Sequence, residues 1–197
     1  MSDLQGSWSM SSSSSSQPGG LSEDTMVALT IQTAGAIQSA PRRLHCWFSG
    51  TDGCIRDAHG ELLWLATDKQ TAWSGADGQI NSVATRADAP GERAALLREP
   101  APEAVAMHDL RSACAWLDIR NHVRAPVVRP VMLDRRVERF SGPAARFVDV
   151  SISCDLETGV ILQILARSPD RGGLTVEASK IEVAARDNTF FDLVERL

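Results

Sequence analysis

The most regular pattern of hydrophobic and polar positions lies in the last third of the chain, where the two kinds of residue alternate strictly from position 148 to 154. The apolar positions are Val148, Val150, Ile152 and Cys154, and the polar positions are Asp149, Ser151 and Ser153. Because successive side chains of a strand point to opposite faces, this alternation predicts a half-buried β-strand. The segment Val160–Ala166 follows a turn at 155–159 and is apolar on nearly both faces, which predicts a strand inside the sheet.

The next apolar stretch changes its phase in the middle. Its apolar positions are Leu174, Val176 and Ala178 before the change and Ile181 and Val183 after it. One extra residue in a strand shifts the alternation by one position in this way. We therefore predict a β-bulge at Ser179-Lys180.

A second block of strands is predicted between positions 44 and 84. The predicted strands are Leu44–Phe48, Cys54–Arg56, Glu61–Ala66, Gln70–Trp73 and Gln79–Ala84. Turns rich in Gly and Asp, Asp57–Gly60 and Ser74–Gly78, separate consecutive members of this set. Short strands joined by tight turns indicate an antiparallel meander.

Helical patterns are predicted near the start, in the middle and at the end of the chain. The predicted helices are Ser22–Ala40, Gly91–Arg98, 102–119 and a last one that begins near Asp187 or Asn188. Ser22 is a capping residue and Pro41 ends the first helix, whereas Pro102 suits the first position of the third. The last helix contains the adjacent pair Phe190-Phe191. One of the two is a candidate contact for a partner; the alternative is that both are buried on a broad face of the helix.

The order of these elements favours an α+β fold. No strand–helix–strand alternation and no internal repeat is evident, so we expect a mainly antiparallel sheet with N-terminal, central and C-terminal helices. The expected single domain covers residues 22–197. Before it, residues 1–21 include Ser11–Ser16 and a Gly/Pro-containing segment, which predicts a disordered Ser/Gly-rich tail.

The composition indicates a bacterial cytoplasmic protein. The first 25 residues contain no cationic start followed by an apolar segment, and no stretch approaches the roughly 18 apolar residues of a membrane helix. Four cysteines without a close pairing pattern favour a reducing compartment. The Ser-rich start resembles the N-termini of type III secretion substrates, which makes secretion independent of a signal peptide the alternative.

The charge distribution singles out the segment 120–146, which holds seven arginines against two acidic residues in a chain of net charge −5. We call these arginines the arginine strip: Arg120, Arg124, Arg129, Arg135, Arg136, Arg139 and Arg146. Guanidinium groups offer forked donors to carboxylates and phosphates. The predicted anion- or partner-binding residues are Arg124, Arg129, Arg135, Arg136 and Arg139. This hypothesis requires that the guanidinium groups gather on one wet surface and are not neutralised by the protein's own carboxylates.

A structural role is the alternative for the arginine strip. Pro126 and Pro130 make Val127–Leu133 an edge strand or an extended crossing, since proline cannot donate to a ladder. Charged residues on an edge strand also prevent unwanted pairing with other chains.

Part of the arginine strip resembles a known signature. Arg135-x-x-x-Arg139 followed by Asp149-x-Ser151 resembles the RxxxR and D/NxSxxG motifs of PilZ domains, which would imply cyclic-di-GMP binding. The resemblance covers about twenty residues. Cys154 stands where the glycine of that motif belongs, and the two motifs are closer together than in the family, so we do not assign the chain to it.

Metal and catalytic motifs do not emerge from the sequence. His45, Cys46, Cys54 and His59 are of zinc-ligand type but lack the tight spacing of a zinc knuckle, and we expect no metal and no cofactor. Cys114 and Cys154 lie on predicted apolar faces, where a thiol is inert. No nucleophile elbow, phosphate loop or dinucleotide-binding turn is present. No catalytic residue is therefore predicted.

The preferred hypothesis is a non-enzymatic protein-interaction module, such as an adaptor, a chaperone-like protein or a regulator, which binds a partner or itself through the arginine strip. A binder of a small anionic ligand such as a nucleotide, through the same arginines, is one alternative. An enzyme with an unrecognised site is the other. Nucleic acid is disfavoured, because Phe140 is the only aromatic residue of the strip and the rest of the chain carries a charge of −10.

Overall fold

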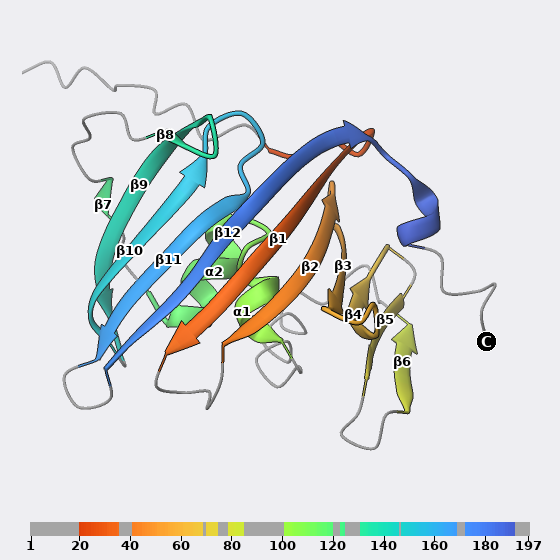
Figure 1. Cartoon of the computed structure of the whole chain (residues 1–197), viewed down its shortest axis with the longest axis horizontal. Helices are drawn as coiled ribbons and strands as arrows, with labels where there is room; N and C mark the ends of the chain where they lie inside the picture. The colour runs from red at the N-terminus through yellow and green to blue at the C-terminus, as the bar shows by residue number, and fades with distance from the viewer. Residues whose placement is uncertain are drawn as a thin grey trace, which may run out of the picture.

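The computed structural model describes residues 20–35, 41–68, 70–74, 79–84, 101–119, 123–124, 131–145, 147–168 and 172–191. These residues form a sheet of 12 strands, and all of its pairs are antiparallel. The strand order is β6-β5-β4-β3-β2-β1-β12-β11-β10-β9-β7, and β8 pairs with β9 off this path (Figure 1). The predicted mainly antiparallel sheet is confirmed, and the described fold is mostly β with minor helices, so helices contribute less to it than the predicted α+β class implies.

The strands of the first half are β1 (Thr25–Gly35), β2 (Arg42–Ser49), β3 (Asp52–Asp57), β4 (Leu62–Ala66), β5 (Gln70–Ser74) and β6 (Ile80–Ala84). The strands of the second half are β7 (Val123–Arg124), β8 (Val131–Met132), β9 (Arg135–Ala144), β10 (Phe147–Asp155), β11 (Ile161–Ser168) and β12 (Gly172–Ala185). The helices are α1 (Pro102–Val105), α2 (Leu110–Leu117) and the 3-10 helix η2 (Asn188–Phe190).

Strand β1 occupies the place of the predicted N-terminal helix at 22–40. It pairs with β2 on one side and with β12 on the other, so it lies in the middle of the sheet. Residues of both faces are buried, namely Val27, Leu29 and Ile31 on one face and Met26 and Thr30 on the other. Because both faces are covered, the apolar positions do not alternate and they also fit a helical face. The helix prediction is wrong because β1 pairs with a strand on each side and contains β-branched residues, and these two factors outweigh the helix-like spacing of its apolar residues.

The predicted β-bulge in β12 is confirmed. Thr30 pairs with Lys180 and Ile31 pairs with Ala178, which leaves Ser179 as the extra residue. The hydroxyl of Ser179 donates a hydrogen bond to the carbonyl oxygen of Thr30 at 3.1 Å. The bulge keeps Ala178 and Ile181 on the same face of the sheet.

A second bulge, in β10, was not predicted. Phe147 pairs with Ala144 and Val150 pairs with Gly142, so β10 has one residue more than β9 in this stretch. Phe147 is buried and Val148 is 61% exposed as a result. The prediction that Val148 shares the buried face of Ile152 is therefore wrong.

The predicted central helix is two helices. Asp109 caps the start of α2, since its Oδ1 accepts a hydrogen bond from the Ser112 amide at 2.6 Å. The amide of Ile161 donates to the carbonyl of Met107 at 2.9 Å, which fixes the intervening segment to β11. A single helix is therefore wrong. The spacing of apolar residues in 102–119 predicts a buried stripe, and its members Ala106, Met107, Ala113 and Leu117 are buried, whereas Leu110 and Cys114 are half-buried.

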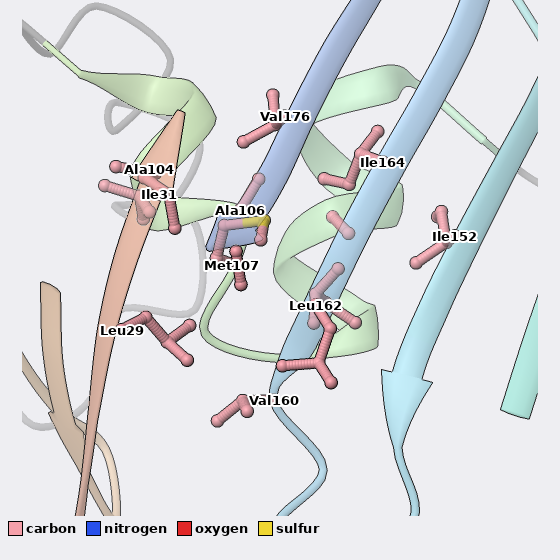
Figure 2. Close-up of a cluster of buried hydrophobic side chains, with 14 of the residues drawn as sticks. Leu29, Ile31, Ala104, Ala106, Met107, Ile152, Val160, Leu162, Ile164 and Val176 are labelled. Carbon is pink, nitrogen blue, oxygen red and sulfur yellow. The ribbon is translucent and has the colours of Figure 1, made fainter. Parts of the chain in front are cut away.

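The helices cover one face of the sheet, which we call the helix face; the opposite face is the outer face (Figure 1). Figure 2 shows Met107 and Ala104 among strand residues such as Leu29, Ile31 and Ile164. Burial of each large apolar side chain contributes roughly 1.5–3 kcal/mol, so this contact layer is the main source of stability.

The C-terminal segment packs against the outer face of β1–β5. Phe191 is 3% exposed and belongs to a cluster with Met26 and Leu65, and Phe190 stacks on Trp47 with ring centroids 4.9 Å apart. Of the predicted last helix, the described residues include only the start, where η2 is a 3-10 helix capped by Asp187; the continuation at 192–197 lies outside the described residues. Both phenylalanines contact the sheet, which agrees with the broad buried face.

Several predictions fall outside the described residues: most of the tail at 1–21, the helix at 91–98 and the turn residues 75–78. That 22–197 forms one domain stays a prediction. In the described part of the chain, no helix has the length and apolar character needed to cross a membrane.

His108 connects α2 to the β2–β3 turn. Its Nε2 donates to the carbonyl of Gly50 at 3.0 Å, and its Nδ1 lies 2.8 Å from Oδ2 of Asp109. Burial would raise the pKa of Asp109, but the hydrogen bond and charge of His108 and the amide of Ser112 outweigh burial and hold the pKa well below its usual value.

The depressed pKa of Asp109 predicts acid sensitivity. A carboxylate with a lowered folded pKa stabilises the fold fully above its unfolded value of about 4, and this stabilisation is lost as the pH falls toward the folded value. Asp109→Asn keeps a capping side chain and removes the charge. We expect urea unfolding from pH 6 to pH 3 to show a shallower loss of stability in the variant than in the wild type. Equal slopes would contradict this role.

Gly53 is required by close packing in β3. A Cβ atom at this position would lie 2.6 Å from Cζ3 of Trp64 and 3.2 Å from Cδ1 of Phe48. We expect Gly53→Ala to lower the free energy of unfolding by about 1–3 kcal/mol through overpacking. Gly173→Ala is the control, since its Cβ would meet only the Ala166 carbonyl at 3.4 Å. Equal stability of the two variants in chemical denaturation would refute the prediction.

Candidate functional site

The structure places three of the five predicted site residues with their side chains, and all three lie on β9: Arg135, Arg136 and Arg139. Arg124 is in β7, where its backbone pairs with Phe140 of β9. Arg129 is outside the described residues, as are two further members of the arginine strip, Arg120 and Arg146. The candidate site is therefore built on β9 and its neighbour β10.

Arg135 is neutralised by the protein itself. Its Nη2 lies 2.9 Å from Oδ2 of Asp155 and 2.8 Å from Oε2 of Glu157, and its Nε donates to Oδ1 of Asp155. The hydrogen bond with Asp155 raises the pKa of Arg135, against the opposing effect of burial. Thr158 donates to the same carboxylate from its amide and its hydroxyl. The expectation of uncompensated guanidinium groups does not hold at Arg135.

Arg136 and Arg139 differ from Arg135 in having no ion pair in the described part of the chain. Strand alternation places Arg135 and Arg139 on the outer face and Arg136 on the other side of β9. Arg136 is exposed and Arg139 is half-buried. The three arginines therefore do not form one surface, and only Arg139 is an unpaired cation of the outer face of β9 in the described chain.

Arg139 lies directly opposite Ser153 of β10, and Ser141 lies opposite Ser151. We call these four residues the serine–arginine block. Side chains of directly paired residues on one face lie roughly 4.5–5.5 Å apart at Cβ, so the four form a continuous polar area. On the far side of Ser153, Gln163 of β11 donates from Nε2 to Oε1 of Glu177 at 3.1 Å.

Two atoms of the serine–arginine block are buried without a hydrogen-bond partner, Nε of Arg139 and Oγ of Ser153. Ser153 has no exposed surface. The described residues contain two other such side-chain atoms, on Thr33 and Trp64, but only Arg139 and Ser153 are paired directly with each other.

The sequence indicated some of this arrangement. It placed Ser151 and Ser153 together on the polar side of a strand, and it singled out Arg139. The register between β9 and β10, which brings Arg139 to Ser153, has no sequence signal that we could identify. This register is set only when the two strands pair in the folded protein.

The cysteines are unsuited to nucleophilic chemistry. Burial first, and then the charge of Asp155, raises the pKa of Cys154 to about 12, and burial also raises the pKa of Cys46, Cys54 and Cys114. A thiol with a raised pKa is protonated at neutral pH and reacts slowly. In the described ranges, no group of three or more His, Cys, Asp or Glu side chains could hold a metal ion.

The fold is similar to that of solved protein structures. A chain of the Pseudomonas aeruginosa MucA/MucB complex matches with a TM-score of 0.52 and 14% identity over 86% of this chain and 56% of that chain. MucB in complex with MucA(peri) gives 0.49 at 10% identity over 86% and 55% of the two chains. An uncharacterized conserved protein from Thermus thermophilus gives 0.47 at 9% identity over 85% and 84%.

The first of these similarities shows that the chain has a MucB-like fold. The chain spans just over half of the length of the MucB chains that it matches. No protein-family model and no curated protein matches the sequence. We therefore infer the function from the residues of the chain itself.

The ion pair of Arg135 predicts a structural role for this residue. Arg135→Ala leaves the buried Asp155 without its cation, which we expect to cost about 1–3 kcal/mol of unfolding free energy. Arg136→Ala removes an exposed and unpaired arginine of the same strand, and its effect should stay within about 0.5 kcal/mol. Denaturant unfolding of both variants tests the difference; equal effects would show that the Arg135 pair contributes nothing.

Proposed function

We propose that the protein is a non-enzymatic binding module that recognises a protein partner through the outer face of β9 and β10. The observation that carries the proposal is Arg139, a half-buried cation of this face that has no carboxylate partner in the described chain. Arg135, in contrast, is occupied by Asp155 and Glu157. An unpaired guanidinium on a rigid strand is a specific donor for an acidic group of a partner.

The fold similarity supports a protein as the partner. MucB, whose fold this chain resembles, is seen in a complex with the protein MucA. The C-terminal segment covers the outer face of β1–β5, whereas the outer face of β9–β11 presents the half-buried Arg139, Ser141 and Ser151 and the exposed Leu165. The serine–arginine block supplies that face with hydrogen-bonding groups between β9 and β10.

Nucleic acid fits this surface less well. Phe140, the one aromatic residue of the arginine strip, is buried on the helix face at 7% exposure and cannot stack on bases. The chain also carries a net charge of −5, which repels a long polyanion. A compact acidic group on a protein avoids both obstacles.

A cytoplasmic location stays a prediction, with export as its alternative. Cys46, Cys54, Cys114 and Cys154 are all free thiols, which supports a reducing compartment. Cys46 and Cys54 lie on opposite faces of the sheet, since they pair with Ile55 and Trp47 respectively, and therefore they do not form a disulfide with each other.

The proposal predicts which arginine is needed for partner capture. We expect Arg139→Ala to lose most of a partner that the wild-type protein captures from extracts of its host, because the acidic group of the partner loses its donor. Arg136→Ala, on the other side of β9, and Arg111→Ala, on the exposed side of α2, should capture the same partner at wild-type levels. Quantitative mass spectrometry of the captured proteins measures the ratio.

Thermal unfolding of each variant accompanies the capture experiment, so that a loss of fold is not mistaken for a loss of contact. Arg139→Ala should melt at or near the wild-type temperature, since Arg139 forms no ion pair within the described chain. Equal capture by folded Arg139→Ala and wild type would remove Arg139 from the interface and the proposal with it.

A further inference from the structure

Two neighbouring buried donors without acceptors are the least expected feature of the outer face. Nε of Arg139 and Oγ of Ser153 have no hydrogen-bond partner among the residues that the structure describes, and the two residues pair directly across β9 and β10. Buried polar groups in folded proteins are nearly always satisfied, because a missing partner leaves the cost of removing the group from water uncompensated. Ser49 shows the ordinary case: it is equally buried, and its hydroxyl donates to the carbonyl of Glu23 at 3.0 Å.

The atoms that surround this pair offer hydrogen-bond donors for an oxyanion. Arg139 contributes a guanidinium, Ser153 contributes a buried hydroxyl, and Ser141 and Ser151 add two half-buried hydroxyls on the same face. Strand pairing fixes the backbone at all four positions. Because Nε of Arg139 and Oγ of Ser153 are buried, a side-chain movement must expose them when a ligand arrives. A charged acceptor gains more than a neutral one from such donors.

We propose that the serine–arginine block is an oxyanion site that takes a carboxylate or phosphate group, and that this group belongs to the partner. The inference rests on the proposed function, because it names the chemistry that the partner presents. The ligand oxygen accepts from Nε of Arg139 and from the hydroxyl of Ser153, which satisfies both atoms at once. The two serines 141 and 151 complete the contact with their hydroxyls.

The charges around the site favour a carboxylate over a phosphate dianion. Asp155 lies on the same face two positions along β10 from Ser153, and the cluster that it forms with Glu157 and Arg135 holds two carboxylates and one cation. Glu177 lies two strands from Ser153 and is bonded to Gln163. Arg139 is one cation, so it balances one negative charge. A dianion would therefore add an uncompensated charge to surroundings that are already negative. Binding of acetate should therefore exceed that of phosphate at a pH where phosphate is mostly doubly charged.

The test compares melting temperatures in acetate, phosphate and chloride at matched ionic strength. A ligand that binds only the folded state raises the melting temperature by mass action. We expect acetate to raise the melting temperature of the wild type above its value in chloride, and phosphate to raise it less. Arg139→Ala and Ser153→Ala should show no difference between the three salts. Ser49→Ala is the matched control and should retain the wild-type response to acetate.

The behaviour of the two serine variants in chloride gives a second, independent readout. Ser49→Ala removes a satisfied hydroxyl and should melt at a lower temperature than the wild type. Ser153→Ala removes an unsatisfied hydroxyl and should melt at the wild-type temperature or above it. A Ser153→Ala protein that is as destabilised as Ser49→Ala would overturn the inference, because the hydroxyl would then be satisfied without a ligand.

The outcomes separate this inference from the proposed function. If no oxyanion shifts the wild type, or if Arg139→Ala responds as the wild type does, the oxyanion site is refuted. Partner capture by the wild type and its loss in Arg139→Ala would still support the proposed function in that case. If acetate acts as expected and the partner is captured equally by all variants, the site binds a free small anion and the proposed function is the part that fails.

Discussion

The pairing of β1 with β12 is the interaction on which the sheet depends. It joins residues that are distant in the sequence, such as Thr30 and Ser179, which are 149 positions apart, and it places β1 between β2 and β12. Leu29 and Ile31 of β1 thereby become part of the hydrophobic core that also contains Met107 (Figure 2). Without β1, the meander β2–β6 and the meander β9–β12 would each end in an apolar strand with unpaired backbone groups, and such edges favour aggregation.

This constraint also determines the position of the proposed binding surface. The helices lie on one face of the continuous sheet (Figure 1). The register of β9, β10 and β11 places Arg139, Ser153 and Gln163 side by side on the opposite, outer face. Arg135, only four residues away on the same face, has a different role because the turn after β10 brings Asp155 and Glu157 to it. The same residue type therefore forms an ion pair at one position and has none at the other in the described part of the chain.

The sequence predicted the parts of the fold that local patterns determine. The meander strands, the Asp57–Gly60 turn and the bulge at Ser179 followed from alternation and turn residues, and the buried stripe of the central helices followed from its spacing. It failed where long-range contacts decide: β1 has two buried faces, so its pattern imitates a helix, and the bulge at Val148 depends on pairing with β9. For the same reason the sequence identified Arg139 but could not show that Arg135 is neutralised or that Ser153 lies beside Arg139.

Hydrogen–deuterium exchange on the full chain, with and without the captured partner, tests the location of the binding surface most directly. We expect the partner to slow amide exchange in β9 and β10, over 135–144 and 147–155, and to leave the exchange rates in α1 and α2 unchanged. Slower exchange confined to the helices at 102–105 and 110–117, with β9 and β10 unaffected, would contradict it.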